Sequence, residues 1–167
     1  MIIQKTYKFY AAHRNEELSD KCRNLHGHRY GVTCFFEVER TGSLTTLFAD
    51  FDSAIEPFLS REYDHAMLIH VNDPLYRSLL RHMEEHSESL KLKRLPYPST
   101  VENLGHRLFT EITDMGLRLN CLEIRETDSS VVRYTRDDWV ADNRYYADAQ
   151  LPQTSLRDVP TASPALK

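Results

Sequence analysis

Alternating apolar and polar positions mark two strands near the N-terminus. Residues 2–10 are rich in β-branched and aromatic side chains, which favour extended structure. In residues 26–40, alternate positions are apolar and share one face of a strand. These apolar positions are Tyr30, Val32, Cys34, Phe36 and Val38. The turn-forming residues 41–43 end this second strand.

Three later segments repeat apolar residues at helical spacing. The first covers residues 50–59, with Asp50 as its N-cap. The second follows the Asn-Asp-Pro sequence at 72–74. The third begins near Ser99, which stands at capping-box spacing from Glu102. Its apolar face comprises Val101, Leu104, Leu108, Ile112 and Met115.

Two further strands are predicted after Gly116, at 117–126 and 131–135, and the turn between them makes a hairpin. The order of strand, strand, helices, strand, strand favours an α+β fold with an antiparallel sheet. Residues 84–98 are charged and are predicted to be a loop. The proline-containing segment 141–167 is predicted to be a tail, which leaves residues 1–140 as the domain.

Composition narrows the class of protein. The chain has 167 residues, 41% of them hydrophobic, which suits one globular domain. Its formal net charge of −4, without a basic run, argues against nucleic acid and anionic membranes as partners. Neither a signal-peptide pattern nor an apolar stretch of about 18 residues is present. Three sparse cysteines then indicate reduced thiols and a cytoplasmic protein.

Histidines supply the strongest chemical signal. His26 and His28 are two apart on a predicted strand and therefore share a face. His13 ends the first strand and falls beside them if the two strands form a hairpin. Three imidazoles with an open fourth position are typical of catalytic zinc, whereas Cys22 as a fourth ligand would make the site structural. The other histidines considered are expected to be solvated or on helix surfaces: His70, His82, His86 and His106.

Three further positions are candidates for chemistry. Cys22 lies in a polar loop, where a nearby metal would lower the pKa of its thiol. Cys34 and Cys121 are expected to be buried in strands. Asp64 precedes His65, and an aspartate can fix the tautomer of a histidine and raise its basicity. Glu126 lies at the end of a predicted strand, where the sequence by itself favours a solvated side chain.

Six stretches, in order, resemble the 6-pyruvoyl-tetrahydropterin synthase / 6-carboxytetrahydropterin synthase family. They are Phe9-Tyr-Ala-Ala-His-Arg, Cys22-x3-His-Gly-His-x-Tyr, Asp50-Phe, Tyr63-Asp-His-x2-Leu, Thr100-x-Glu-Asn-Leu and Glu126-Thr. The resemblance implies the tunnelling fold, a four-stranded antiparallel sheet of order ββααββ with helices on one face. It also implies a homo-oligomeric barrel, a hexamer built as a dimer of trimers, with active sites between subunits.

Carried over by residue, the resemblance assigns Zn²⁺ to His13, His26 and His28. It makes Cys22 the catalytic thiolate and Asp64 with His65 the proton relay. Glu126 would anchor the pterin, whose two parallel N–H donors match the two oxygens of a carboxylate. Glu102 would line the same pocket, although its capping-box position explains it equally well.

The resemblance also implies a small-molecule pterin substrate. Three residues separate Cys22 from His26, a spacing that resembles the 6-carboxy enzymes of the deazapurine (queuosine) pathway. A zinc-dependent lyase would convert 7,8-dihydroneopterin triphosphate into 6-carboxytetrahydropterin, acetaldehyde and triphosphate. The alternatives are the 6-pyruvoyl product of the biopterin pathway and a non-catalytic zinc-containing pterin-binding protein. Arg14, Arg23 and Arg29 are candidates for the triphosphate by proximity.

Overall fold

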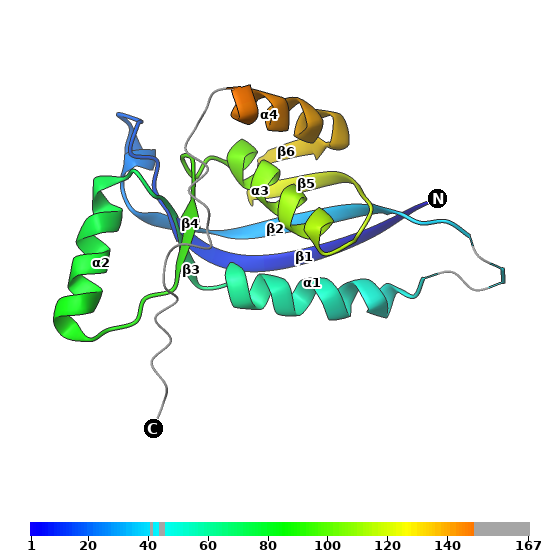
Figure 1. Cartoon of the computed structure of the whole chain (residues 1–167), viewed down its shortest axis with the longest axis horizontal. Helices are drawn as coiled ribbons and strands as arrows, with labels where there is room; N and C mark the ends of the chain where they lie inside the picture. The colour runs from blue at the N-terminus through cyan, green and yellow to red at the C-terminus, as the bar shows by residue number, and fades with distance from the viewer. Residues whose placement is uncertain (41, 44–45, 149–167) are drawn as a thin grey trace.

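The computed structural model describes residues 1–40, 42–43 and 46–148 (Figure 1). The strands are β1 (Ile2–His13), β2 (His26–Glu37), β3 (Ala66–His70), β4 (Leu92–Leu95), β5 (Leu119–Thr127) and β6 (Ser130–Thr135). The helices are α1 (Phe48–Glu62), α2 (Pro74–His86), α3 (Val101–Asp114) and α4 (Arg136–Asp148), with a single 3₁₀ turn, η1 (Lys21–Arg23), between β1 and β2. The predicted strand pairs at both ends and the three predicted helices are therefore present, and the α+β class is confirmed.

The strands form one sheet in the order β4-β3-β1-β2-β5-β6. β1 and β2 pair antiparallel along their whole length, from Ile2 opposite Glu37 to His13 opposite His26. β5 pairs antiparallel with both β2 and β6, whereas β3 runs parallel to β1 and to β4. The hairpin therefore occupies the middle of the sheet, and its closed end carries the histidines.

The expected four-stranded antiparallel sheet is wrong, because the described part of the chain has a mixed sheet of six strands. β3 has five residues, four of them buried, so it lacks the alternation that would have revealed it. β4 has four residues, Leu-Lys-Arg-Leu, and lies in the charged segment 84–98 that was predicted to be a loop. Two short parallel strands thus extend the sheet beyond β1.

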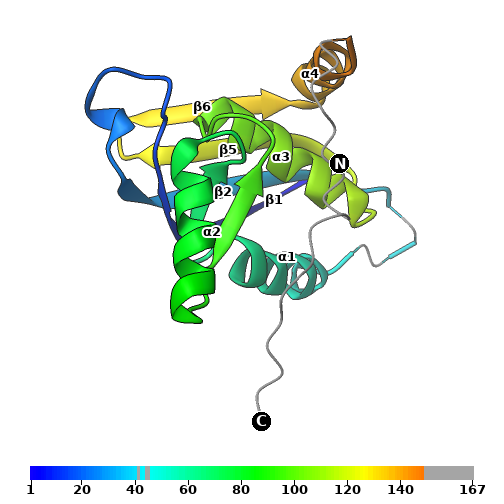
Figure 2. The same cartoon turned by 60° about the vertical axis from the view of Figure 1, so that its left-hand side comes forward.

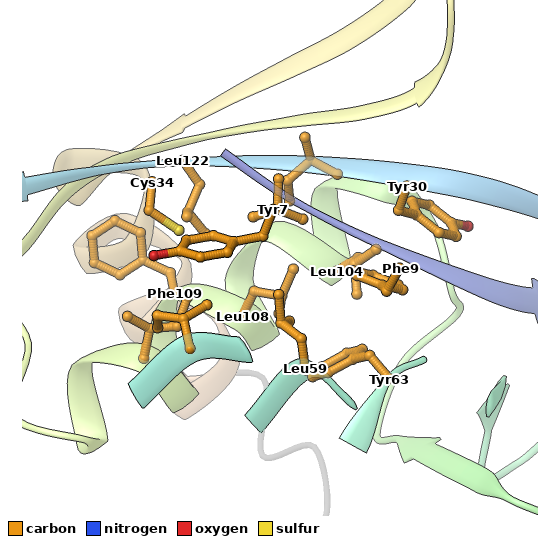
Figure 3. Packing of buried hydrophobic residues seen from close by; sticks show 14 of the residues in the cluster. Tyr7, Phe9, Tyr30, Cys34, Leu59, Tyr63, Leu104, Leu108, Phe109 and Leu122 are labelled. Carbon is orange, nitrogen blue, oxygen red and sulfur yellow. The ribbon is translucent and has the colours of Figure 1, made fainter. Parts of the chain in front are cut away.

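The core lies between one face of the sheet and the helices α1 and α3 (Figure 3). Phe9 from β1, Tyr30 from β2 and Leu108 from α3 are all almost completely buried there. Tyr30 follows the alternation predicted for the second strand, and Leu108 lies on the predicted apolar face of the third helix. α2 instead lies beside β3 and β4 at one end of the molecule (Figure 2). Two predicted helices thus cover the central strands.

Among the described helices, none is long and apolar enough to cross a membrane.

Two predicted helix caps are wrong by a few residues. α1 begins after Leu47, and the Asp50 carboxylate accepts a hydrogen bond from the Leu47 N–H at 2.9 Å, from within the first turn. α3 is capped by Thr100, which accepts from the Asn103 N–H. Ser99 instead donates to the backbone of the β1 end, so its spacing from Glu102 is not a capping box.

The predicted tail begins later than residue 140, because α4 continues to Asp148. This helix is attached through two aromatic rings and their hydrogen bonds. The Trp139 ring stacks on Phe109, with centroids 5.4 Å apart, and its Nε1 donates to Thr110 Oγ1 at 2.9 Å. The Tyr146 ring stacks on Tyr97, with centroids 5.1 Å apart, and its hydroxyl donates to Asn103 Oδ1 at 2.8 Å. Because the rest of the helix is mostly polar, no apolar stripe marked it in the sequence. Residues 149–167 lie outside the described residues.

Candidate functional site

The three histidines of the predicted zinc site meet at the closed end of the β1–β2 hairpin. His13 pairs with His26 across the hairpin, and His28 follows on the same face. The ring centroids are 4.5 Å apart for His13 and His26, 5.1 Å for His13 and His28, and 4.9 Å for His26 and His28. One nitrogen from each ring lies within 4.8 Å of the others. This is a three-nitrogen donor set of the type that zinc prefers.

Hydrogen bonds to backbone carbonyls orient two of these rings. His13 Nδ1 lies 3.0 Å from the carbonyl oxygen of Ser99, and His26 Nδ1 lies 2.7 Å from that of Asn24. Such bonds fix the tautomer that leaves Nε2 available for a metal. His13 Nε2 is buried and has no hydrogen-bond partner among the described residues. Burial also lowers the pKa of His13, which favours the neutral imidazole that ligation needs. The residues therefore fit a metal ion.

Glu126 reaches the same place from β5. One of its carboxylate oxygens, Oε1, lies 3.5 Å from His13 Nε2 and accepts a hydrogen bond from the Tyr30 hydroxyl at 3.3 Å. Its side chain retains 23% of its exposure, so a ligand can still contact it. The sequence alone left Glu126 as a plausible solvated strand end, whereas the structure brings it beside the histidines.

Cys22 lies in η1, within the loop that connects β1 to β2. Its backbone N–H donates to the Asp20 carboxylate at 2.8 Å, and its carbonyl accepts from the Asn15 N–H at 2.9 Å. The thiol is half-buried. Partial loss of solvent and the nearby Asp20 raise its pKa, and Glu126 acts in the same direction. The chain's own charges therefore favour the thiol over the thiolate that the sequence led us to expect.

Asp64 and His65 form the predicted pair. His65 Nδ1 lies 2.8 Å from Asp64 Oδ2, and the Tyr10 backbone N–H donates to Asp64 Oδ1 at 2.9 Å. That backbone hydrogen bond is the main reason why the pKa of Asp64 lies below its ordinary value, so a carboxylate faces the imidazole. His65 has φ of 57°, a left-handed conformation that is unusual outside glycine.

The Asp64–His65 pair lies on the other face of the sheet from the three clustered histidines. The His65 ring is next to the Tyr10 ring, with centroids 6.0 Å apart. Tyr10 is exposed, whereas its neighbours Phe9 and Ala11 are buried on the helix side with His13, as alternation along β1 requires. An open hollow of about 750 Å³ on the Tyr10 side is lined by His65 and His28 among other residues. The pair therefore does not contact the three rings within the described chain.

Two histidines expected to be solvated are buried. His70 is 8% exposed, and its Nδ1 contacts the Glu16 carboxylate. His106 is 9% exposed and lies between the Tyr97 hydroxyl and Asn143 of α4. Polar partners from distant parts of the chain satisfy both rings, and no local pattern could have revealed that. His82 and His86 are exposed, as predicted.

Residues on both sides of Asn15 hold the Cys22 loop against the start of α2. The Arg14 guanidinium makes two hydrogen bonds to Asp73, which is 1% exposed. Glu16 contacts His70, and the Glu17 carboxylate lies close to both of these side chains. Arg14 is thus engaged by a buried carboxylate, which removes it as a candidate for phosphate. Glu102 is exposed in the first turn of α3, three residues after Ser99.

Comparison with known proteins agrees with this geometry. A family model described as 6-pyruvoyl tetrahydropterin synthase matches residues 2–137. The 6-carboxy-5,6,7,8-tetrahydropterin synthase of Synechocystis sp. is 28% identical over 140 residues, which cover 80% of this chain and 92% of that protein. The protein of the same name from Aquifex aeolicus is 29% identical over 120 residues, covering 62% of this chain and 73% of that one.

Solved structures extend the likeness of the fold. An uncharacterized protein from Wolinella succinogenes has a TM-score of 0.64 at 23% identity, covering 81% of this chain and 98% of that one. The 6-pyruvoyl tetrahydropterin synthase of Caenorhabditis elegans has a TM-score of 0.52 at 23% identity, covering 81% and 94%. At these low sequence identities, the superpositions show similarity of fold alone.

Proposed function

Because the chain belongs to the 6-pyruvoyl tetrahydropterin synthase family of enzymes, we propose that it is a zinc-dependent lyase acting on 7,8-dihydroneopterin triphosphate. With one water consumed, the products are 6-carboxy-5,6,7,8-tetrahydropterin, acetaldehyde and triphosphate, as in the deazapurine pathway. The observation that carries the proposal is the three-histidine cluster, whose buried His13 Nε2 has no hydrogen-bond partner in the described chain. The name of the curated relatives and the three-residue spacing from Cys22 to His26 support the 6-carboxy product.

The roles of the residues follow from their positions. His13, His26 and His28 would hold Zn²⁺, which when bound polarises the side-chain hydroxyls of the substrate as a Lewis acid. Glu126, held by the Tyr30 hydroxyl, accepts two hydrogen bonds from the N–H edge of the pterin. Cys22 removes a proton from the carbon framework. Its raised pKa means that the thiolate must be stabilised by positive charge that the assembled site brings.

His65, oriented by Asp64, moves protons at the other end of the substrate side chain. Because this pair and the zinc histidines lie on opposite faces of one chain, we propose that His65 serves the site of a neighbouring subunit. A trimeric barrel formed edge to edge, and a hexamer of two such rings, would bring them together. Pairing of the outer strands β4 and β6 would also cover the edges of the described sheet.

Two measurements test the proposal. Metal analysis of the purified protein should find about one zinc per chain. Incubation of the zinc-loaded protein with dihydroneopterin triphosphate should release acetaldehyde. A 6-pyruvoyl product without acetaldehyde would assign the chain to the biopterin-type reaction. Tight binding of the pterin without turnover would leave a pterin-binding protein, and protein without zinc would end the lyase proposal.

A further inference from the structure

We propose that a notch in the sheet, where β5 separates from β2, binds the triphosphate group of the substrate through Lys8, Arg29 and Arg125. This inference rests on the proposed function for the identity of the anion. The three cations lie on three adjacent strands, and none belongs to the residues assigned above to zinc, proton transfer or the pterin.

The notch arises from the way the β2–β5 ladder ends. Its last pair is Gly31 opposite Arg125, whereas β2 continues for five more residues toward His26. β5 has an irregularity at Glu126 and then turns into β6. The opening encloses about 400 Å³ and is lined on one side by residues 27–29 and 31 of β2, and on the other by residues 125–128, with Lys8 of β1. His28 and Glu126, whose side chains lie by the histidine cluster, are thus also part of its lining.

Two glycines leave the floor of the notch open. On this face of β2, the side-chain positions are Gly27, Arg29 and Gly31, so Arg29 stands between two residues without side chains. Lys8 and Arg125 are the partners of Gly31 on either side. A Cβ at Gly31 would lie 3.6 Å from the Arg125 Cβ, already in contact, so a larger side chain would fill the space. The register thus gathers three long cations around a hollow.

The cations of the notch are not neutralised by partners in the described chain. Lys8 and Arg29 make no ion pair or side-chain hydrogen bond there, and Arg125 donates only to the carbonyl oxygen of Asp128, at 2.8 Å. Two acidic residues also line the notch. Glu126 directs one oxygen to Tyr30 and His13 on the other face, and Asp128 lies in the turn. In a protein of net charge −4, three such cations in one hollow indicate an anionic ligand.

Two other cations of the chain are already engaged. Arg14 is bound to the buried Asp73, and Arg133, on the same sheet face as Arg125, pairs with Glu123 at 3.7 Å. A triphosphate requires several N–H donors, and the planar arginine fork matches phosphate oxygens in pairs. Glu126 lines the notch and also contacts His13, so the proposal requires that the phosphates of a pterin bound at Glu126 enter this opening.

Calorimetric binding of inorganic triphosphate to the full-length, zinc-loaded protein tests this inference. Arg29→Gln, Arg125→Gln and Lys8→Gln should each weaken binding roughly ten-fold, and the wild-type affinity should fall as salt rises. Arg133→Gln, which removes a paired cation from the same face, should bind as wild type. Gly31→Leu, which fills the hollow and keeps the charges, should also weaken binding. Zinc content should be unchanged in all variants, because none of the substituted residues is a ligand.

The measurements distinguish a wrong assignment of the triphosphate site from a wrong assignment of the reaction. If triphosphate fails to bind wild type, or binds the Arg29 and Arg125 variants equally well, the notch is not its site. If these variants raise the KM for dihydroneopterin triphosphate with kcat little changed, the notch binds the substrate. If triphosphate binding requires the notch cations but no acetaldehyde forms, the site stands and the proposed product is wrong.

Discussion

The guanidinium of Arg14, the residue after His13, makes two hydrogen bonds to the buried carboxylate of Asp73, one of them at 2.7 Å. Asp73 also caps α2 by accepting from the Leu75 N–H. Burial alone would raise the pKa of Asp73, but Arg14 and the Leu75 N–H outweigh it and hold that pKa below its ordinary value. This ion pair joins the end of β1, next to His13, to the start of α2.

Asp73→Asn should lower the free energy of unfolding by about 3 kcal/mol at pH 7, because it leaves Arg14 without its buried partner. A carboxyl whose folded pKa is lowered stabilises the protein fully above its unfolded pKa of about 3.9, and this stabilisation is lost as pH falls below it. The difference between wild type and variant should therefore shrink toward pH 3 in urea unfolding. Asp114→Asn, an exposed control, should change little; an equal loss there would refute the assignment.

Cys22→Ala should reduce turnover at least 100-fold, since a proton-transfer group supplies about 10²–10⁴. Zinc content should not change if the thiol is catalytic. Ser19→Ala, an exposed and uncharged position in the same loop, serves as the control and should keep wild-type turnover. Loss of zinc from the Cys22 variant would instead identify the thiol as a fourth, structural ligand.

Glu126→Gln should weaken binding of a pterin such as neopterin by about ten-fold or more, because hydrogen bonds to a charged group contribute more than neutral ones. Zinc content should persist. Glu123→Gln changes a carboxylate on the same strand that faces the other way and pairs with Arg133. Equal pterin affinity in wild type and the Glu126 variant would contradict the anchoring role.

Mixing two inactive variants tests whether the site combines residues from neighbouring subunits. Cys22→Ala and His65→Ala, dissociated together and reassembled in equal amounts, should regain about a quarter of the wild-type activity, because random neighbours complete that share of sites. Each variant treated alone is the control. A mixture as inactive as its components would place His65 and Cys22 of one chain in the same site.

Removal of metal should destabilise the protein, since zinc binds only the assembled hairpin end and its binding energy adds to folding. Chelation should lower Tm by several degrees, and added zinc should restore it. His13→Ala should abolish the effect of the chelator, whereas His86→Ala, exposed on α2, should preserve it. An unchanged Tm on chelation would contradict the metal site.

The long, strongly patterned elements of this fold could be predicted from the sequence. Alternation along β2 and the helical spacing of Leu104, Leu108 and Ile112 each reflect one buried face, and local patterns record that directly. The short parallel strands could not be found, because β3 is buried on both faces and β4 has only four residues. α4 was missed because two aromatic residues and their hydrogen bonds attach an otherwise polar helix, without an apolar stripe.

The candidate site was predictable where it depended on neighbours in a hairpin. His13, His26 and His28 follow from strand register alone. Ser99, which orients His13, and Asp73, which binds Arg14, come from distant segments, and only the folded chain reveals their contacts. The separation of His65 from the zinc histidines was equally hidden, since it depends on where β3 joins the sheet.

The left-handed backbone of His65 has a consequence for attempts to improve this protein. A residue with a side chain pays roughly 1 kcal/mol for that conformation, which glycine adopts freely. Selection for heat resistance alone would thus drive residue 65 toward glycine and discard the imidazole. The stability of the fold and the function of the imidazole therefore make opposite demands on residue 65. Mutant libraries made to raise thermal stability should leave this residue unchanged.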